Sequence, residues 1–516
     1  MVHAPGIPSS SQESQGGGGG VLEALQIERR EGRLKRRLRR SRAEPAMSRF
    51  ARPLGRPTLF VVALAYFSLL AVLLVLWHMS PGLVLILTMG GIGLMTIMFR
   101  PYWGLHVFVF VLFFELAAAL EEGLTAMQGI GVVLFLGWLL SAAVRRKSPI
   151  RLDALTILGL LYVAWCAATL PSALDVDVGL TRLISFGQLV VASLMFASVV
   201  DDRDKARGIF LAIVSWTFVT TCVALGKYYL GLTPGAVGPV GNRNLLAIYI
   251  NCATVCAYLL YQTTPQKRGR ILLALSLPVF FLGLGLTFSR TGLIVQALVL
   301  ALVWIRVVRE RGFLMLAGSA VTLCLITLLM PTDFYKRVST IVPTIERQQD
   351  TFGVRMRLWN VGIRMIQERP VFGVGPGNFS IGAQRYIHGD IRLVGLSAHN
   401  AYVEVAAETG LVGAGLFVGI LLAAVAQTRR ALRAARSVGA KDMEMFAIMN
   451  EIALLALAVH ALTGGIEILK YLWLLVGMSF ALGRIALSLS EKARPPARAI
   501  SREHEGAWTL APGDSQ

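Results

Sequence analysis

The sequence has little charge for its length. Only 16% of the 516 residues are charged and 55% are hydrophobic, whereas roughly 25% of residues are charged in typical soluble proteins. Cysteine is also scarce: Cys166, Cys222, Cys252, Cys256 and Cys324 all lie inside apolar runs, with neither metal-ligand spacing nor an exposed pair. The composition therefore excludes a soluble globular enzyme, and we expect no structural disulfide.

Long apolar runs take the place of the missing charge. A membrane-spanning helix needs about 20 apolar residues. Windows of that length occur at 58–77, 81–99, 101–120, 124–143, 152–171, 179–199, 208–230, 243–264, 271–288, 291–308, 312–330, 402–427, 447–465 and 468–488. The windows around Arg100 and around Glu467 nearly touch, so the sequence predicts an all-α polytopic membrane protein with about 12–14 transmembrane helices.

The net charge of +20 is concentrated in short segments between the apolar runs. Basic short loops face the cytoplasm in membrane proteins. The basic segments alternate along the chain and comprise the N-terminal tail, 145–147, 203–207, 267–270, 306–311, 429–436 and the C-terminal tail. We therefore expect both termini in the cytoplasm and one long loop, 331–401, on the extracytoplasmic face. Because topology explains the charge, no nucleic-acid partner is expected.

The two ends of the chain differ in composition from the apolar middle. Residues 1–57 contain five consecutive glycines and a cluster of Lys and Arg, which cannot bury a core. We expect a disordered basic cytoplasmic tail there, and its basic stretch is too long for a cleavable signal peptide. The predicted organisation continues with a transmembrane bundle (58–330), the extracytoplasmic catalytic loop (331–401), C-terminal transmembrane helices (402–489) and a cytoplasmic tail (490–516).

The long loop is basic although the topology places it outside. It carries nine Lys/Arg against five Asp/Glu, which fits either contact with anionic lipid headgroups or a site for an anionic substrate. Residues 354–368 have helical periodicity, with Arg357 on the polar face and Arg355 in the middle of the apolar face. A guanidinium that faces protein or membrane is costly unless it is paired. Arg355 is therefore either a structural, snorkelling residue or a binding residue.

Two further arginines stand at outer helix ends. Arg290 belongs to a polar turn, 289–291, that interrupts an apolar stretch from 271 to 305. It either reaches lipid headgroups or meets the basic loop. Arg243 lies in a similar turn at 241–244, where the asparagines also fit ordinary helix capping.

A histidine marks the point where the loop returns to the membrane. The side chain of His399 has the ordinary pKa of about 6.5 that suits a general base near neutral pH, although a single histidine is more often structural. Glu404 and Glu408 share one helix face. They would either orient the histidine or pair with arginines of the loop.

At this point the residues resemble a known family. His399-Asn400 is followed after nine residues by Gly410 and then by Gly413, which resembles the signature of the O-antigen ligase and O-antigen polymerase superfamily of bacterial membrane glycosyltransferases. Three more segments fit it in the expected order: Ser289-Arg290, 353–359 and 370–379 (PVFGVGPGNF). The resemblance covers about residues 235–430. The helix count and the long N-terminal tail depart from the superfamily pattern.

The resemblance implies transfer of a glycan from an undecaprenyl-diphosphate carrier to an acceptor hydroxyl, outside the bacterial cytoplasmic (inner) membrane. Arg290 and Arg355 would bind the diphosphate leaving group through bidentate contacts. His399 would deprotonate the acceptor, with inversion and no covalent intermediate. Supporting candidates are Arg243, Arg357, Asn400, Glu404 and Glu408. No cofactor and no metal are expected, since the Asp-x-Asp triplet at 175–177 arises easily by chance.

Superfamily members differ in their acceptor. Ligases use lipid A core, polymerases use another repeat unit, and a third group uses protein hydroxyls; we favour a ligase or polymerase of surface polysaccharide, such as lipopolysaccharide or exopolysaccharide. The expected partners are the lipid-linked donor, a glycan or lipid A core acceptor and membrane lipids. The alternative is a polytopic transporter or flippase of an anionic lipid-linked glycan. Against it, charged residues are scarce in the helix centres and no internal repeat is visible.

Overall fold

The computed structural model describes residues 99–114, 126–145, 151–237, 242–307, 351–387, 393–465 and 469–493. All of them belong to one compact unit that begins at Gly91. The windows 58–77 and 312–330, all but the last residue of 81–99 and the predicted N-terminal tail lie outside the described residues, as does the predicted C-terminal tail from residue 494 on; its first four residues, 490–493, instead belong to the last described helix. The other eleven predicted windows each correspond to a described helix.

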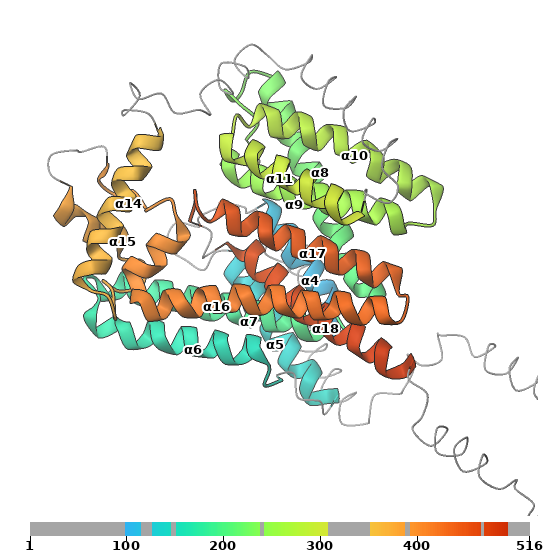
Figure 1. Cartoon of the computed structure of the whole chain (residues 1–516), viewed down its shortest axis with the longest axis horizontal. Coiled ribbons are helices and arrows are strands. Elements are labelled where there is room, and N and C mark those ends of the chain that lie inside the picture. The colour runs from blue at the N-terminus through green and yellow to red at the C-terminus, as the bar shows by residue number, and fades with distance from the viewer. Residues whose placement is uncertain are drawn as a thin grey trace, which may run out of the picture. The chain divides into compact units, whose positions relative to one another are not determined.

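The described residues form helices and turns, with no strand among them. The α-helices are α4 (Pro101–Phe114), α5 (Ala126–Arg145), α6 (Ala154–Thr169), α7 (Val176–Val199), α8 (Arg203–Tyr229), α9 (Arg243–Thr263), α10 (Lys267–Leu286), α11 (Arg290–Val307), α14 (Thr351–Glu368), α15 (Phe379–Ala383), α16 (Ala401–Ser437), α17 (Lys441–His460) and α18 (Lys470–Ala493), with short 3-10 turns η2 (Leu170–Ser172) and η5 (Gln384–Tyr386). Eight of the described helices are long and apolar enough to cross a membrane. The prediction of an all-α polytopic membrane protein is confirmed (Figure 1).

The helices pack side by side, and hydrogen bonds join several of the turns that connect them. Helix α16 packs against α18, α17 and α6, while α9 packs against α17, α10 and α8. The first residue of α16, Ala401, donates from its N–H to the carbonyl of Ala461 at the end of α17, over 2.8 Å. Arg369, which follows α14, donates to the carbonyl of Ser172 between α6 and α7, over 3.1 Å. These bonds place helix α14, the turn between α6 and α7 and the turn between α17 and α18 at one end of the bundle (Figure 1).

Near the middle of α17, a buried carboxylate pairs with arginines from two other helices. The side chain of Glu451 on α17 is only 1% exposed; it accepts from Arg306 on α11 over 3.2 Å and from Arg429 on α16 over 2.7 Å. A buried carboxylate is costly unless it is paired in this way. Part of the basic charge that the sequence assigns to topology therefore also has a packing role.

Helix α16 is broken where the loop meets it. Gly410 has φ +69° and ψ −179°, which are not helical values. The chain from Pro370 runs against the break: the N–H of Leu411 donates to the carbonyl of Pro370 over 2.8 Å, and Val374 N–H donates to Ala407 O over 3.0 Å. Backbone groups released inside a membrane protein must find such partners. The loop segment 370–379 thus supplies hydrogen-bond partners for backbone groups of α16 that the break leaves without a partner in the helix.

Glycine is required in that segment because the two backbones are in contact. At Gly373, φ is +67° and an added Cβ would lie 2.4 Å from the carbonyl group of Glu408. At Gly410 it would lie 1.9 Å from the carbonyl oxygen of Val371. Only glycine combines a left-handed backbone with this close approach. The glycine-rich run of the sequence is therefore a packing feature of the broken helix.

The loop has its own small apolar core, which confirms the predicted helix over 354–368 as part of α14. Leu358, Val361 and Met365 on α14 are buried against residues from the rest of the loop and against Ala407 of α16. The indole N–H of Trp359 donates to the carbonyl of Ala398 over 3.1 Å. Helix α14 is thereby fixed against the residue that precedes His399.

Candidate functional site

A pocket of about 1320 Å³ opens at the end of the bundle that carries the loop. One part is apolar and is lined by residues of α4, α5 and α7, down to Phe196 near the end of α7. The other part is polar. Its polar and charged lining includes Asp177, Thr181, Arg182, Ser185, Gln188, Asn242, Asn244, Ser289, Thr291, Arg355, Ser397, His399, Glu404, His460, Thr463 and Lys470. From Asp177 to Phe196 the pocket follows α7 for about 28 Å, at 1.5 Å per residue.

Arg290 and Arg355 lie within electrostatic range of each other although they are far apart in sequence. Burial, and then the positive charge of Arg290, lower the pKa of the Arg355 guanidinium below its ordinary value. The Nε atom of Arg355 is buried and has no hydrogen-bond partner among the described residues. Two neighbouring guanidinium groups repel each other, and an anion between them would remove that cost. The pair has the chemistry of a phosphate-binding site.

The start of α11 is held so that Arg290 stands at its first residue. Phe288 has φ +53°, an uncommon value for a bulky side chain. The Ser289 hydroxyl donates to Asn244 Oδ1 over 2.9 Å and accepts from Gly292 N–H over 3.2 Å. This N-cap arrangement explains the predicted polar turn. It connects the start of α11 to the start of α9.

His399 occupies a strained position in the pocket wall. Its φ is +50°, and a non-glycine residue in the left-handed region costs about 1–3 kcal/mol unless its surroundings hold it. The next residue, Asn400, is buried and caps α16 by accepting from the N–H groups of Tyr402 and Val403 over 3.1 and 3.2 Å. Burial, and then the charge of Arg355, lower the pKa of His399 below 6.5. The imidazole is therefore neutral near pH 7.

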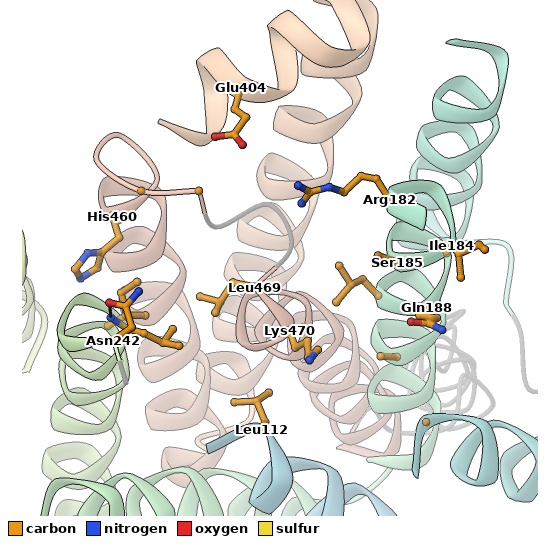
Figure 2. Close-up of a pocket in the computed structure, with 18 of the residues that line it drawn as sticks. Leu112, Arg182, Ile184, Ser185, Gln188, Asn242, Glu404, His460, Leu469 and Lys470 are labelled. Atoms are coloured by element: carbon orange, nitrogen blue, oxygen red, sulfur yellow. Dashed lines mark hydrogen bonds between the residues drawn. The ribbon is translucent and has the colours of Figure 1, made fainter. Parts of the chain in front are cut away.

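The two predicted glutamates have different surroundings. Glu404 lines the pocket, and Figure 2 shows its carboxylate directed toward the same space as Arg182. Glu408, one turn further along α16, accepts from Phe379 N–H over 3.1 Å and interacts electrostatically with Arg182 on α7. This differs from the expectation that it would orient the histidine or pair with a loop arginine. Glu408 instead joins α7, α16 and the glycine-rich segment.

Among the predicted residues, Arg355, His399 and Glu404 line the pocket, whereas Arg290, Asn400, Glu408, Arg243 and Arg357 do not. Arg243 is exposed at the first residue of α9, and Asn242 caps that helix by accepting from Asn244 N–H over 2.9 Å, so capping accounts for this turn. Arg357 is half-buried on α14 and is not among the lining residues. In the Asp-x-Asp triplet, Asp175 caps α7 and bonds through its N–H to Asn378 over 2.8 Å. Its carboxylate therefore has a structural role.

The comparison with known families is consistent with this geometry. Residues 271–418 match the O-antigen ligase family model. No match was found among curated proteins. The O-antigen ligase segment contains Arg290, Arg355 and His399 together with the glycine-rich segment and the break in α16. The predicted relationship to the O-antigen ligase and polymerase superfamily is confirmed, and it supports a multi-pass membrane enzyme that ligates or polymerises glycans.

Three charged or titratable residues of the pocket lie outside the residues singled out from the sequence. Arg182 lies on α7, outside the O-antigen ligase segment, and extends into the pocket (Figure 2). His460 ends α17, and Lys470 begins α18. Each lies in a predicted apolar window, and an ionisable residue inside a membrane segment is a functional candidate by default. That signal was present in the sequence for all three.

Proposed function

We propose that the protein transfers a glycan from an undecaprenyl-diphosphate carrier to an acceptor hydroxyl, at the extracytoplasmic face of the bacterial cytoplasmic membrane. The proposal rests mainly on one observation. Arg355 on α14 and His399 in the turn before α16 line one pocket and interact electrostatically, and Arg290 at the start of α11, between the lining residues Ser289 and Thr291, interacts electrostatically with Arg355. A cationic pair beside a neutral imidazole is the combination that this reaction needs.

The arginines act on the leaving group. As the bond between the anomeric carbon and the diphosphate oxygen breaks, negative charge grows on that oxygen. Guanidinium groups placed beforehand stabilise such charge, and their planar fork matches the phosphate oxygens. Arg290 and Arg355 perform this role without a metal ion or a nucleotide.

His399 acts on the acceptor. Its neutral imidazole removes the proton from the acceptor hydroxyl while the oxygen attacks the anomeric carbon from the face opposite the diphosphate. The configuration at that carbon is inverted in a single displacement, and no covalent enzyme intermediate forms. The lowered pKa of His399 keeps the base unprotonated in the free enzyme.

The remainder of the pocket suits a lipid-linked donor. The apolar walls from α4, α5 and α7 match a prenyl chain, and the polar part matches sugars. A volume of 1320 Å³ also exceeds the roughly 300–1,000 Å³ of common small-ligand sites, as expected for an enzyme that holds a donor and an acceptor together. A surface glycan or lipid A core is the acceptor class that we favour.

Transport of an anionic lipid-linked glycan is the second candidate, and the depth of the pocket along α7 favours it. His399 distinguishes glycan transfer from transport, because a transporter needs no general base. Purified protein would be incubated with undecaprenyl-diphosphate glycan and a hydroxyl acceptor in the presence of a chelator. We expect His399→Ala to reduce transfer by about 10²–10⁴-fold, the usual contribution of a positioned base.

The matched control is His106→Gln. His106 lies on α4, bonds to the backbone carbonyl of Tyr102 and is not among the lining residues, so its variant should transfer at the wild-type rate. Wild-type transfer by the His399→Ala variant would remove this residue from the mechanism. If the wild type itself binds and moves the lipid-linked glycan without transferring it, transport is the function.

A further inference from the structure

His460 is a second histidine of the pocket, and its hydrogen bonding determines where its proton resides. The side chain is 4% exposed and lines the pocket (Figure 2). Its Nε2 atom lies 2.9 Å from Nδ2 of Asn251 on α9. The same Nδ2 lies 3.1 Å from the carbonyl oxygen of Gly292 on α11. The side-chain amide nitrogen of Asn251 is thus within hydrogen-bonding distance of both His460 and Gly292.

These two contacts fix the direction of each bond. The carbonyl of Gly292 only accepts, so the amide of Asn251 must present its NH₂ group to it. That group has two hydrogens, and the second points to His460 Nε2. Nε2 must therefore accept, which it does only when it carries no proton. The imidazole is held in the neutral form that bears its proton on Nδ1.

The Nδ1–H group is the part of the ring that remains for a ligand. It makes no hydrogen bond within the part of the chain that the structure describes. A polar hydrogen in a largely buried site costs free energy unless an acceptor meets it. Since His460 lines the pocket, an acceptor atom of a bound ligand is the natural partner.

The location of His460 indicates which ligand that is. Through Asn251 it is joined to Gly292, two residues after Arg290. Through the next residue, Ala461, it is joined to Ala401, two residues after His399. His460 therefore lies between the helix start that carries the diphosphate-binding arginine and the turn that carries the base. Under the proposed function, this interval is where the reacting end of the donor would bind.

We propose that His460 donates a hydrogen bond from Nδ1 to an oxygen of the lipid-linked donor, in its diphosphate or its first sugar, and that Asn251 holds the required tautomer. The inference rests on the proposed function for the identity of the donor. It assigns the two pocket histidines opposite roles. His399 accepts a proton from the acceptor, whereas His460 is a fixed donor that keeps its own.

The test compares three substitutions by direct binding to the purified full-length protein. Asparagine at position 460 can place an N–H near the site of Nδ1, glutamine extends toward the site of Nε2, and alanine does neither. The probes are undecaprenyl diphosphate and the same lipid carrying its glycan. We expect His460→Ala and His460→Gln to weaken binding by at least about tenfold. His460→Asn should stay within roughly threefold of the wild type.

The two probes separate the two acceptor groups. Weaker binding of both probes assigns the bond to the diphosphate, and weaker binding of the glycan-bearing lipid alone assigns it to the sugar. Equal loss in all three variants would show a packing role and overturn the proposal, as would wild-type binding by His460→Ala. In either case wild-type transfer activity still supports the proposed function. If the wild type binds neither probe, both proposals fail.

A spectroscopic measurement tests the tautomer without any ligand. In protein with ¹⁵N-labelled histidine, the resonances lost in His460→Asn identify His460. We expect a protonated Nδ1 and an unprotonated Nε2, and we expect Asn251→Leu to remove this fixed preference. A protonated Nε2 in the wild type would contradict the proposal.

Discussion

At the scale of single residues, the protonation state of His399 controls the proposed reaction. Burial and the charge of Arg355 both favour the neutral imidazole by lowering its pKa. A base works only when it is unprotonated, so activity is lost as the pH falls through this lowered pKa. The enzyme should therefore remain active below pH 6.5, where an exposed histidine would already be largely protonated.

The pH dependence of kcat/KM gives the first prediction. In the wild type the acid limb should have its midpoint below pH 6.5. Arg355→Gln removes the second cause of the shift while burial remains, so the midpoint should move to higher pH although the rate itself is lower. The measurement is the initial transfer rate from pH 4.5 to 8 in each protein. A midpoint that does not move in Arg355→Gln would show that the two side chains are not coupled.

Residue type and position were enough to single out the three residues on which the proposed site is built. Arg290 and Arg355 are conspicuous because each is a cation where an apolar side chain is expected, and His399 because it ends a basic loop. Other features depend on three-dimensional packing. That Glu408 would interact with Arg182 depends on α6 and α18, each of which packs against both α7 and α16. Such packing is not encoded in the periodicity of any one helix.

At the scale of elements, the break in α16 is the feature on which the site depends. The part of the helix before the break carries Glu404 into the pocket wall, and the glycine-rich segment bonds to it at the break. Gly410 permits both the turn of the backbone and the approach of the Pro370–Val371 carbonyls. Closing the break into a regular helix would displace that segment.

Substitution of Gly410 should therefore be far more damaging than substitution of a neighbouring glycine. Gly410→Ala adds a backbone cost of about 1–3 kcal/mol, because φ +69° with ψ −179° is a conformation that essentially only glycine adopts, and an overpacking cost of about 1–3 kcal/mol. We expect clear loss of thermal stability in detergent and at least tenfold slower transfer. The control is Gly415→Ala on the same helix, which meets nothing within 4 Å and should be neutral or slightly stabilising. Equal behaviour of the two variants would show that the break has no role.

The sequence predicts the membrane helices, but it does not predict the break at Gly410. Each described membrane helix corresponds to an apolar window, because the length of the hydrocarbon layer sets the length of the run. Gly410 and Gly413 lie in an apolar stretch that is equally compatible with a continuous helix packed through small residues. What decides between the two is the carbonyl of Pro370, about forty residues earlier in the sequence.

At the scale of the whole molecule, the orientation in the membrane decides where the reaction occurs. The basic-loop pattern predicts that the pocket end is extracytoplasmic, and the described helices place α14 and the pocket at one end. The same pattern predicts that both termini are cytoplasmic.

Cysteine labelling tests the orientation. Gln367 on α14 and Arg433 near the end of α16 are both exposed and stand at opposite ends. In a background with Cys222, the exposed native thiol, replaced by serine, Gln367→Cys should react with an impermeant thiol reagent in intact spheroplasts. Arg433→Cys should react only after the membrane is opened. The reverse pattern would place the pocket in the cytoplasm and exclude the proposed carrier reaction at the outer face.

The way the loop is packed has a consequence for how the protein can be divided. Loops usually tolerate excision or transplantation because few contacts tie them to the rest of a protein. Here the core of the loop includes Ala407 from a membrane helix, and Val374 and Gly375 take their backbone partners from that same helix. The region around Arg355 is therefore not a detachable module. Expressed alone as a soluble fragment, it would lack one wall of its core and the residues that face it across the pocket.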